Sequence, residues 1–497
     1  MHFYGVSHVP IRRPRHNASR FPFEIGCKNT NFFRYTKKYF DHSAKKQYDS
    51  HNNSIIFYSH IYYLFFFCVI IYMAKLTIQN FGPIKDARIE IKKFNIIIGP
   101  QSSGKSCILK VASFCRWLEK RIELTQKPDE WLKEEVILQH LVKFHKMEGY
   151  FRETSKIRFE SPFVIFSISY KKEKKLIPSG KIHLSVTTRK YHSLFNWQKS
   201  NRWNYQRPKI AYIPAERNIV AAIPNWFDVR LDENNIKNYM SDWDDTRSSF
   251  DQQKPLQILN LGANYYYNKD KREDWIDLGK NTHIRFTNAS SGIQSITPIL
   301  VLLRYFTFHV FNQPNRSSHD QDKENAFLRK LLRDEIIGIP TDAIESAWIV
   351  KSEDAKKYEE AVIRYEQPQY TSIYLEEPEE NLFPSTQYEL IKWITQQINS
   401  NHYHDIFIST HSPYILSSFN NLIQAYDSLY TNKDNAEIIK QIIGTDAYIP
   451  FENISVYAIK DGRTSDIKDK EVRLISQTEL DAVSDTISTD FSYLLEL

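Results

Sequence analysis

Glycine and cysteine are both scarce in this chain, with 13 Gly and 4 Cys among 497 residues. The four cysteines (27, 68, 107 and 115) lack the spacing of a disulfide framework or a zinc site, which fits a reducing cytoplasm. We expect Cys107 and Cys115 to pack in a core. Heptad repeats are also missing, because residues 110–370 carry no sustained a/d pattern, and this excludes long coiled-coil arms.

Two of the few glycines fall in one short motif. Residues 99–106 read Gly-Pro-Gln-Ser-Ser-Gly-Lys-Ser and follow directly on an apolar run at 94–98. This is the G-x-x-x-x-G-K-S pattern of a phosphate-binding loop between a strand and a helix. The glycines let backbone N–H groups turn towards phosphates, and the following helix adds the positive end of its dipole. The motif therefore predicts nucleotide binding.

The motif also predicts which residues bind the nucleotide. Lys105 would reach the β- and γ-phosphates as a point charge, and the Ser106 hydroxyl would take one coordination position on Mg²⁺. ATP and Mg²⁺ are the expected cofactors. The expected contact set is Gly99, Pro100, Gln101, Ser102, Ser103, Gly104, Lys105, Ser106 and Cys107.

A second acidic motif follows at residues 371–379, Thr-Ser-Ile-Tyr-Leu-Glu-Glu-Pro-Glu. A short apolar strand that ends in paired acids is typical of a phosphate-loop ATPase, which needs one carboxylate for the metal and one for the attacking water. Glu376 is expected to hold Mg²⁺ and Glu377 to orient the water, with a sharp turn at Pro378 bringing both towards the nucleotide. The alternative is an acidic, solvated turn.

Two further segments carry candidate residues. Residues 288–295, Asn-Ala-Ser-Ser-Gly-Ile-Gln-Ser, precede an apolar helix, so that Ser291, Gly292 and Gln294 lie where a helix N-terminus could bind a phosphate. Residues 405–413, Asp-Ile-Phe-Ile-Ser-Thr-His-Ser-Pro, predict a strand that ends near His411.

Taken in this order, the four motifs resemble the ABC-type ATPase domains of AAA-family proteins related to the OLD (overcoming lysogenization defect) nucleases, over about residues 73–497. The resemblance implies an α/β fold: a P-loop NTPase of ABC-ATPase head type, with a mixed central sheet flanked by helices, an antiparallel β lobe and helical insertions. It also implies that two cores face each other and sandwich ATP. Ser291 and Gly292 would then touch the γ-phosphate bound by the opposite subunit.

The same resemblance implies catalytic roles for Lys105, Glu377 and His411, the last of which would sense the γ-phosphate within its own subunit. Residues 380–384 look like the loop that crosses the dimer interface. Residues 212–217, Tyr-Ile-Pro-Ala-Glu-Arg, resemble a further segment of this branch and make Arg217 a candidate phosphate or interface residue, with an ordinary structural ion pair as the alternative. One departure is Glu376, which stands where the wider ABC pattern has Asp.

Spacing excludes two related classes. About 85 residues separate Ser291 from Glu376, whereas transporter subunits place this motif just ahead of the acidic strand. The 86 residues after His411 are too few for the Toprim nuclease domain of the OLD nucleases, so an effector would be a separate chain. In the terms of this resemblance, residues 99–106 are the Walker A motif, 288–295 the signature, 371–379 Walker B and His411 the His switch. The expected domains are a Walker A lobe (73–122), an antiparallel sheet with insertions (123–290), a lobe with the signature, Walker B and His switch (291–420) and a C-terminal finishing layer (421–497).

Smaller patterns fill in these lobes. Alternation at 156–160, 163–170 and 181–187 predicts antiparallel strands with turns at 171–175 and 178–180. The segment 189–209 interleaves six basic and five aromatic residues without an acid, which indicates either nucleic-acid contact or a solvated surface excursion. Residues 225–288 are polar with little periodicity and are interpreted as a lid or partner-docking insertion. The finishing layer is expected to have a strand at 454–459, a turn at 461–462 and a helix at 480–487.

The net charge of +7 belongs wholly to residues 1–54, since the rest of the chain balances at 56 basic and 56 acidic residues. An uncharged, aromatic-rich run at 55–73 is about long enough to span a bilayer, but the first predicted strand starts immediately after Met73. Residues 1–72 are therefore a doubtful leader, interpreted as an extension from a misplaced start codon, with a membrane anchor as the alternative.

These patterns together predict a cytoplasmic, Mg²⁺-dependent ATPase that forms a homodimer on binding ATP and thereby controls a separately encoded effector. The resemblance suggests anti-phage defence or a DNA-related process as the setting. The alternatives are an ATP-dependent assembly switch without hydrolysis and a membrane-tethered ATPase. DNA is a possible partner, and a membrane is not expected.

Overall fold

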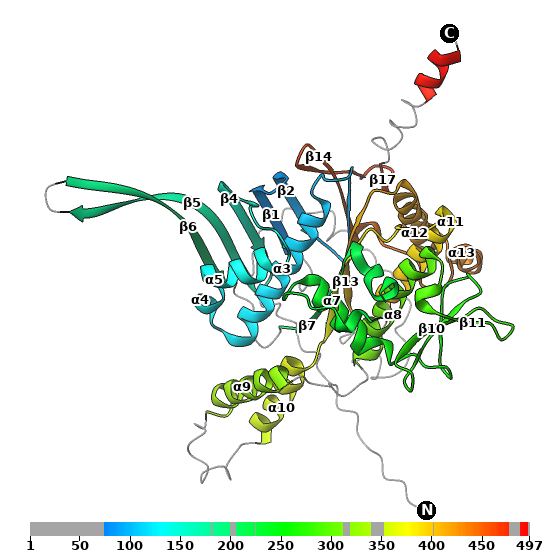
Figure 1. Ribbon diagram of the computed structural model, residues 1–497, viewed down its shortest axis with the longest axis horizontal. Helices are drawn as coiled ribbons and strands as arrows, with labels where there is room; N and C mark the ends of the chain where they lie inside the picture. The colour runs from blue at the N-terminus through cyan, green and yellow to red at the C-terminus, as the bar shows by residue number, and fades with distance from the viewer. Residues whose placement is uncertain are drawn as a thin grey trace, which may run out of the picture. The chain divides into compact units, whose positions relative to one another are not determined.

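The structure is a computed structural model that describes residues 74–179, 182–198, 205–223, 225–311, 319–338, 352–400, 402–476 and 488–495 (Figure 1). The doubtful leader, residues 1–72, lies outside the described residues, and so does the helix predicted at 480–487.

An 11-stranded mixed sheet organises the described part of the chain, in the order β6-β5-β4-β1-β2-β15-β14-β3-β13-β12-β7 (Figure 1). Strands β14, β3, β13, β12 and β7 run parallel, whereas β2, β1, β4, β5 and β6 form an antiparallel half. The bounds are β1 (Ala74–Phe81), β2 (Ile84–Ile91), β3 (Phe94–Ile98), β4 (Phe151–Glu160), β5 (Val164–Ser179), β6 (Ile182–Trp197), β7 (Pro208–Ile213), β12 (Tyr370–Glu376), β13 (His404–Thr410), β14 (Ile454–Lys460) and β15 (Arg463–Asp466). The predicted fold class is confirmed: an α/β fold with a mixed sheet, an antiparallel lobe and helical insertions.

Helices cover both faces of the parallel half, so that β12 and β13 are buried at every position. The two faces lead into separate hydrophobic clusters, because Ile96 and Ile98 of β3 belong to one and Ile97 to the other. Helix α3 packs in the cluster of Ile97, and α8, α11 and α12 pack in the other. The bounds are α3 (Lys105–Thr125), α7 (Asn235–Arg247), α8 (Ser291–Thr307), α9 (His319–Ile336), α10 (Ser352–Glu366), α11 (Pro384–Ile398), α12 (Pro413–Thr431) and α13 (Ala436–Ile443), with short helices α4 (Pro128–Trp131), α5 (Glu134–Ile137) and α6 (Ile219–Ala222).

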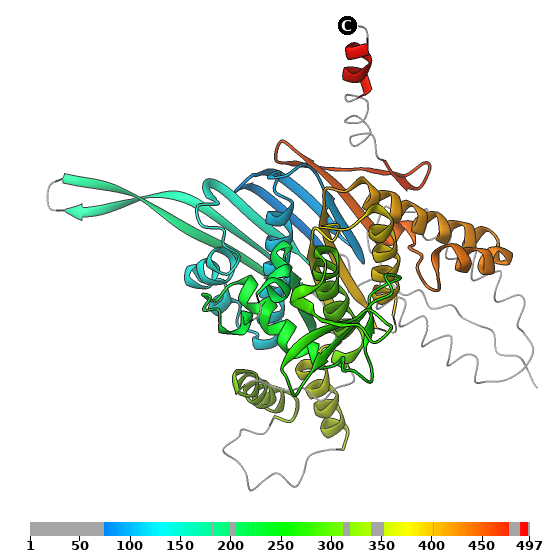
Figure 2. The same cartoon turned by 45° about the vertical axis from the view of Figure 1, so that its right-hand side comes forward.

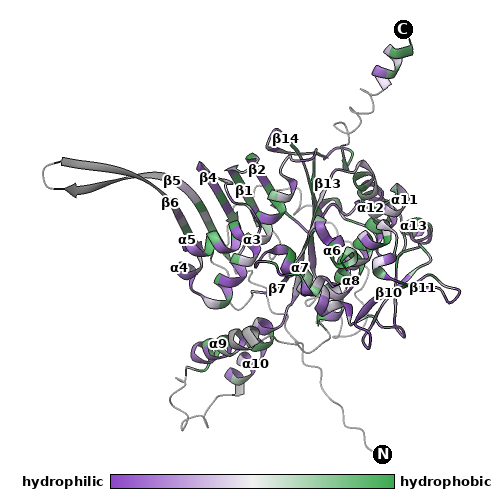
Figure 3. Ribbon diagram, viewed as in Figure 1, coloured by the Kyte–Doolittle hydropathy of each residue, from purple (hydrophilic) through white to green (hydrophobic). Residues whose placement is uncertain are grey.

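Hydropathy follows this layering. Figure 3 shows hydrophobic and hydrophilic stretches alternating along α3, β1 and β2, as expected of elements with one buried face. Among the described residues, one helical segment, Ser291–Phe311, is long and apolar enough to cross a membrane, and most of it is buried within the protein. Its apolar character is therefore explained by its place in the protein core.

The β5–β6 hairpin differs from the sequence prediction. Strand β5 runs without a break through residues 171–175, where a turn was expected, and pairs with β6 residue by residue. Only residues 165–169 of β5 pair with β4, so the hairpin continues beyond the sheet as a two-stranded ribbon (Figures 1 and 2). The predicted turn is wrong because a ribbon of two strands has no core face of its own, and a run of charged residues does not have to interrupt it.

The polar segment 225–288 is not a loose excursion. It forms α7 and a small sheet of β8 (Leu256–Gln257), β9 (Asn264–Asn268), β10 (Glu273–Asp277) and β11 (His283–Arg285). Tyr239, Trp243, Tyr265 and Phe286 from this segment are buried in the same cluster as α8. The segment is thus a packed layer beside the signature helix, which does not favour the predicted lid.

The C-terminal segment is more central than predicted. The strand and the turn at Asp461-Gly462 are confirmed, but β14 lies inside the sheet, parallel to β3. It is therefore not an added outer layer, and its short partner strands are β15, β16 (Lys468–Asp469) and β17 (Leu474–Ile475). Pairing between strands some 360 residues apart leaves no local signal in the sequence.

Candidate functional site

The phosphate-binding motif folds as the sequence predicts. Strand β3 ends at Ile98, and α3 begins at Lys105 directly after the loop. Gly104 has φ of 109°, and a Cβ there would lie 2.5 Å from Cδ1 of Ile84. Only glycine fits this position without strain, because L-residues rarely adopt such a φ.

Lys105 lies at the centre of the loop. Its Nζ donates hydrogen bonds to the carbonyls of Gly99 at 2.8 Å and Pro100 at 2.9 Å. Burial lowers the pKa of Lys105, while the nearby carboxylates of Glu377 and Glu379 act in the opposite direction. The ammonium group is thus held at the loop, close to the acidic end of β12.

A cavity of about 600 Å³ opens beside this lysine. One wall consists of Ser102 and residues 104–107 of the loop and helix, together with Glu377. The other wall comes from the β1–β2 turn at Gly82 and Pro83 and from residues Glu148, Gly149, Tyr150 and Arg152. Burial raises the pKa of the Cys107 thiol to about 12, so Cys107 contributes shape rather than a thiolate.

The paired acids at the end of β12 have different surroundings. Glu376 is buried, and its carboxylate accepts hydrogen bonds from the Tyr212 hydroxyl of β7 and from the backbone N–H of Ala215 at 3.2 Å. Burial, reinforced by Glu376, raises the pKa of Tyr212, which therefore stays a donor. Glu377 reaches the cavity, and its φ of 42° lies in the left-handed region. The sharp turn expected after β12 thus starts at Glu377 itself.

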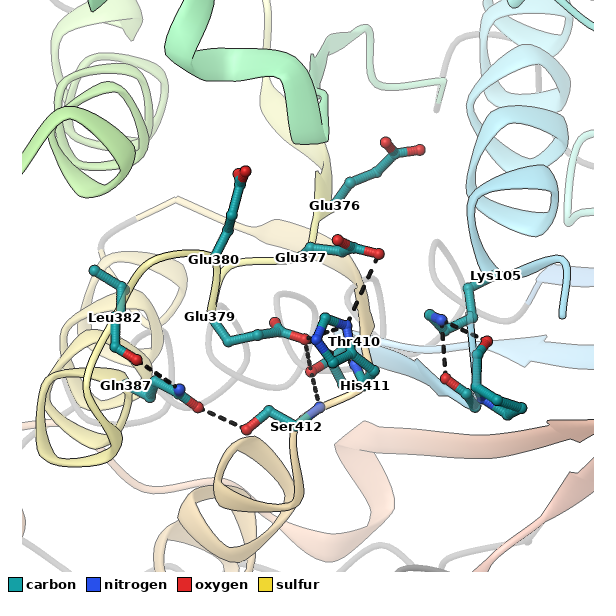
Figure 4. A network of polar contacts seen from close by, with 12 residues as sticks. Lys105, Glu376, Glu377, Glu379, Glu380, Leu382, Gln387, Thr410, His411 and Ser412 are labelled. Atoms are coloured by element: carbon teal, nitrogen blue, oxygen red, sulfur yellow. Dashed lines mark hydrogen bonds and ion pairs between the residues drawn. The ribbon is translucent and has the colours of Figure 1, made fainter. Parts of the chain in front are cut away.

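His411 lies next to Glu377 and Glu379, as Figure 4 shows. Its Nδ1 is 3.3 Å from Oε1 of Glu379 and 3.9 Å from Oε1 of Glu377. The same Oε1 of Glu379 accepts hydrogen bonds of 2.7 Å from the Thr410 hydroxyl and the His411 backbone N–H. Sequence reasoning missed Glu379 as the residue that positions His411, although it is the third acid of the L-E-E-P-E motif.

A second chain of contacts links His411 to the loop at 380–384. The Ser412 hydroxyl donates to Oε1 of Gln387 at 2.6 Å, and Nε2 of Gln387 donates to the Leu382 carbonyl at 3.0 Å (Figure 4). The segment after His411 and this loop are therefore fixed relative to each other.

The signature residues lie elsewhere. Ser291 is exposed at the start of α8, and a Cβ on Gly292 would lie 3.1 Å from the Asn381 carbonyl. The side chain of Gln294 donates to the Thr287 carbonyl at 2.9 Å, so its amide is engaged by the preceding turn. These three residues are outside the wall of the cavity beside Lys105. The structure brings Lys105, Ser106 and Glu377 together and leaves Ser291 and Gly292 at a different surface, beside the loop at 380–384.

Arg217 is buried and has structural partners, which is a correction to its candidacy as a phosphate or interface residue. Its guanidinium donates to the carbonyls of Ser295, Glu376 and Glu377 at 2.8–2.9 Å. Its Nη2 also lies 3.4 Å from Oε2 of Glu380, so Arg217 forms the structural ion pair that was the alternative, and its burial keeps it from reaching a second chain.

Two of the basic residues in the segment 189–209 are engaged within the fold and are therefore not free for the nucleic-acid contact considered above. Arg207 is buried and donates to the carbonyls of Tyr365 at 2.6 Å and Glu366 at 3.0 Å. Lys209 pairs with Asp242 at 2.8 Å. These two cations stabilise the fold, and residues 199–204 lie outside the described part of the chain.

Within the described ranges, no cluster of three His, Cys, Asp or Glu side chains could hold a metal alone. Mg²⁺ bound with a nucleotide takes few protein ligands, because phosphates and waters supply the others. Ser106 lines the cavity, whereas Glu376, the expected carboxylate ligand, lies outside the cavity lining and is bound by Tyr212 and Ala215. The buried hydroxyl of Ser103 has no partner among the described residues, which fits a loop built to donate to an anion.

Comparisons with known proteins agree with this geometry at the level of the domain. Residues 72–115 and 351–416 match the family described as AAA ATPase domain, and these segments contain the phosphate loop, the acidic strand and His411. No curated protein matches the chain.

Several solved structures are similar over most of the chain. An SMC head bound to the C-winged helix domain of ScpA has 10% identity and a TM-score of 0.33, covering 81% of this chain and 99% of the other. The SMC head domain from Thermotoga maritima has 9% identity and a TM-score of 0.32, covering 80% and 99%. The recombination mediator RecF-ATPrS has 13% identity and a TM-score of 0.25, covering 80% and 98%.

Proposed function

We propose that this chain binds ATP at residues 99–107 and hydrolyses it with Mg²⁺. The observation that carries the proposal is that Lys105, Ser106 and Glu377 line one and the same cavity. A phosphate-binding lysine, a hydroxyl ligand and a carboxylate that can orient water are the groups that phosphoryl transfer to water requires.

Each residue has a distinct part in this reaction. Lys105 exchanges the carbonyls of Gly99 and Pro100 for phosphate oxygens, and the loop N–H groups bind the remaining charge. Ser106 and Glu376 hold Mg²⁺, which supplies charge neutralisation on the phosphates when it is bound. Glu377 orients the attacking water, and His411, held by Glu379, lies beside it.

Two substitutions test the proposal on the full chain. Lys105→Ala should weaken binding of a fluorescent ATP analogue by at least about 100-fold, because the site loses its point charge and most of its phosphate affinity. Lys110→Ala, on the same helix but outside the cavity wall, should bind as the parent protein does. Unchanged affinity in Lys105→Ala would refute the assignment of the site.

Hydrolysis is tested separately from binding. Glu377→Gln should lower phosphate release by about 100-fold or more while ATP still binds, since the amide cannot accept the proton of the water. The exposed Glu437→Gln variant is the control. Chelation of Mg²⁺ should abolish turnover in the parent protein.

We further infer that the active form is a homodimer closed around ATP. Ser291 and Gly292 lie outside the cavity, so they could complete a nucleotide site only in another copy of the chain. Two large apolar side chains beside the catalytic loops, Phe383 and Tyr414, are 74% and 52% exposed, which suits a surface that a partner covers. Light scattering on Glu377→Gln should show a doubling of mass only when Mg-ATP is present.

We also propose that the protein is cytoplasmic and that it controls a separately encoded effector, in phage defence or a DNA-related process. These parts of the proposal rest on the sequence resemblance. A second candidate is a switch that binds ATP without hydrolysis. The position of His411, nearer to Glu379 than to Glu377, is the observation that favours it. Multiple turnover in the parent protein would exclude the switch, and its absence alongside tight ATP binding would support it.

A further inference from the structure

Arg217 donates hydrogen bonds to several backbone carbonyls at the site, in addition to its ion pair with a carboxylate. It lies in the 3₁₀ turn Ala215–Asn218 that follows β7, and it is fully buried. Its Nη1 donates to the Glu376 carbonyl at 2.9 Å, and its Nη2 donates to the Glu377 carbonyl at 2.8 Å. One planar guanidinium thus binds the backbone of both acids at the end of β12.

The same guanidinium also binds the signature helix. Its Nε donates to the Ser295 carbonyl at 2.9 Å, and Nη2 lies 3.2 Å from the Ser295 hydroxyl. Ser295 is one turn along α8 from Ser291, and Pro298 follows inside the helix. Because proline has no N–H, the first turns of α8 lose one helical hydrogen bond to the rest of the helix. Contacts from outside the helix, such as those of Arg217, therefore matter for where these turns lie.

Glu377 needs such support. With φ of 42° it occupies a conformation that costs a non-glycine residue free energy and persists only where its surroundings hold it. Its N–H donates to the Ser409 carbonyl of β13 at 2.9 Å, and its carbonyl accepts from Arg217. The strained peptide is thus held on one side by the strand that leads to His411 and on the other side by Arg217.

We propose that Arg217 is a positioning residue that couples the start of α8 to the conformation of Glu377. Any displacement of the first turns of α8, for instance when a second copy presents a phosphate to Ser291, is transmitted through Ser295 and the guanidinium to the Glu377 carbonyl. Turnover would then depend on the position of the signature helix as well as on ATP in the cavity. The inference rests on the proposed ATPase function and specifies how that site is regulated.

The test uses the full chain with three variants. Arg217→Lys keeps the charge but removes the planar fork, so that it can no longer bind Ser295, Glu376 and Glu377 together. Ser295→Ala removes one acceptor from the other end of the link. Tyr239→Phe is the structural control, because the Tyr239 hydroxyl donates to the Arg217 carbonyl at 2.8 Å and touches neither α8 nor the acids through that bond.

Arg217→Lys is expected to lower kcat at least tenfold while the Kd of a fluorescent ATP analogue changes less than twofold. Ser295→Ala should lower kcat severalfold, and the double variant should be no slower than Arg217→Lys alone, since the hydroxyl acts through the guanidinium. Tyr239→Phe should lower the melting temperature without changing kcat per folded chain.

Two results would overturn the inference: a kcat in Arg217→Lys equal to that of the parent, or a loss in Tyr239→Phe as large as that in Arg217→Lys. If Arg217→Lys does not fold, Ser295→Ala decides, because parental kcat in that variant also contradicts the coupling. If the parent protein itself releases no phosphate from Mg-ATP, the proposed function fails, and this outcome is distinct from the others.

Discussion

The buried carboxyl group of Asp405 should make the stability of this fold depend on pH. It is buried at the start of β13, where one carboxylate oxygen accepts a hydrogen bond from the Ser372 hydroxyl and the other has no partner among the described residues. Burial raises the pKa of Asp405 from 3.8 to about 6, although Arg116 and the Ser372 bond oppose the shift. The folded protein therefore binds this proton more tightly than the unfolded chain does.

The sign and the size follow from proton linkage. A carboxyl group whose pKa is raised by folding stabilises the folded state most below its unfolded pKa, and this stabilisation is lost as the pH rises through the folded pKa. At pH 5, one unit below the folded pKa, the contribution of Asp405 is about 1.4 kcal/mol, and at pH 7.5 it is close to zero. Asp405→Asn removes the titration and should also remove this difference.

The assay is urea unfolding of the parent and of Asp405→Asn at pH 5.0 and pH 7.5. We subtract the free energy of unfolding of the parent from that of the variant at each pH. This difference should be about 1.4 kcal/mol higher at pH 7.5 than at pH 5.0, because only the parent gains stability from Asp405 at pH 5.0. Asp434→Asn, at an exposed carboxylate, is the control and should show the same effect at both pH values. If Asp405→Asn also has equal effects at both pH values, the argument from burial is refuted.

Two further substitutions probe the nucleotide site. Gly99→Ala should destabilise the fold by about 1–3 kcal/mol and weaken ATP binding, because a Cβ would lie 2.6 Å from the Ile459 carbonyl, a backbone atom that cannot rotate away. Unfolding and ATP titration should be compared with those of the parent protein. Tyr212→Phe removes the hydroxyl donor of Glu376 and leaves it the Ala215 N–H at 3.2 Å, so this variant should raise the Mg²⁺ concentration for half-maximal turnover severalfold. An unchanged Mg²⁺ requirement would mean that Tyr212 does not orient Glu376.

Local motifs could be predicted from the sequence because their geometry is contained within about ten residues. The phosphate loop, the acidic end of β12 and the strand before His411 each consist of a strand and the turn that follows it. In such a segment the chain direction and the residue types fix where the side chains lie. The same reasoning identified Glu376 and Glu377 but gave no information on which donors would bind them.

Contacts between distant segments could not be predicted in this way. The link between Arg217 and Glu377 spans about 160 residues, and the sequence pattern left Arg217 divided between two interpretations. The role of Glu379 was missed because its partners, Thr410 and His411, lie about 30 residues further on. A pattern of residue types shows which groups are available, whereas packing determines which of them meet.

Strand β14 illustrates why packing decides the nucleotide site. Ile459 of β14 lies against Gly99, at the start of the phosphate loop. The Gly462 carbonyl, just after β14, accepts hydrogen bonds from the N–H groups of Lys85 at 2.7 Å and Asp86 at 3.1 Å. A Cβ on Gly462 would also lie 2.5 Å from the Pro83 carbonyl, and Pro83 belongs to the opposite wall of the cavity.

Both walls of the cavity therefore rest on one strand and its turn near the C-terminal end of the described sheet. A chain synthesised only as far as α12 would contain every nucleotide-binding motif that the sequence reveals, yet it would lack the strand beside β3 and the support under Pro83. Long-range strand pairing of this kind is established late in folding, because the ends of a long loop must first meet. The two walls of the nucleotide site are thus supported only when residues 454–462 lie against β2 and β3.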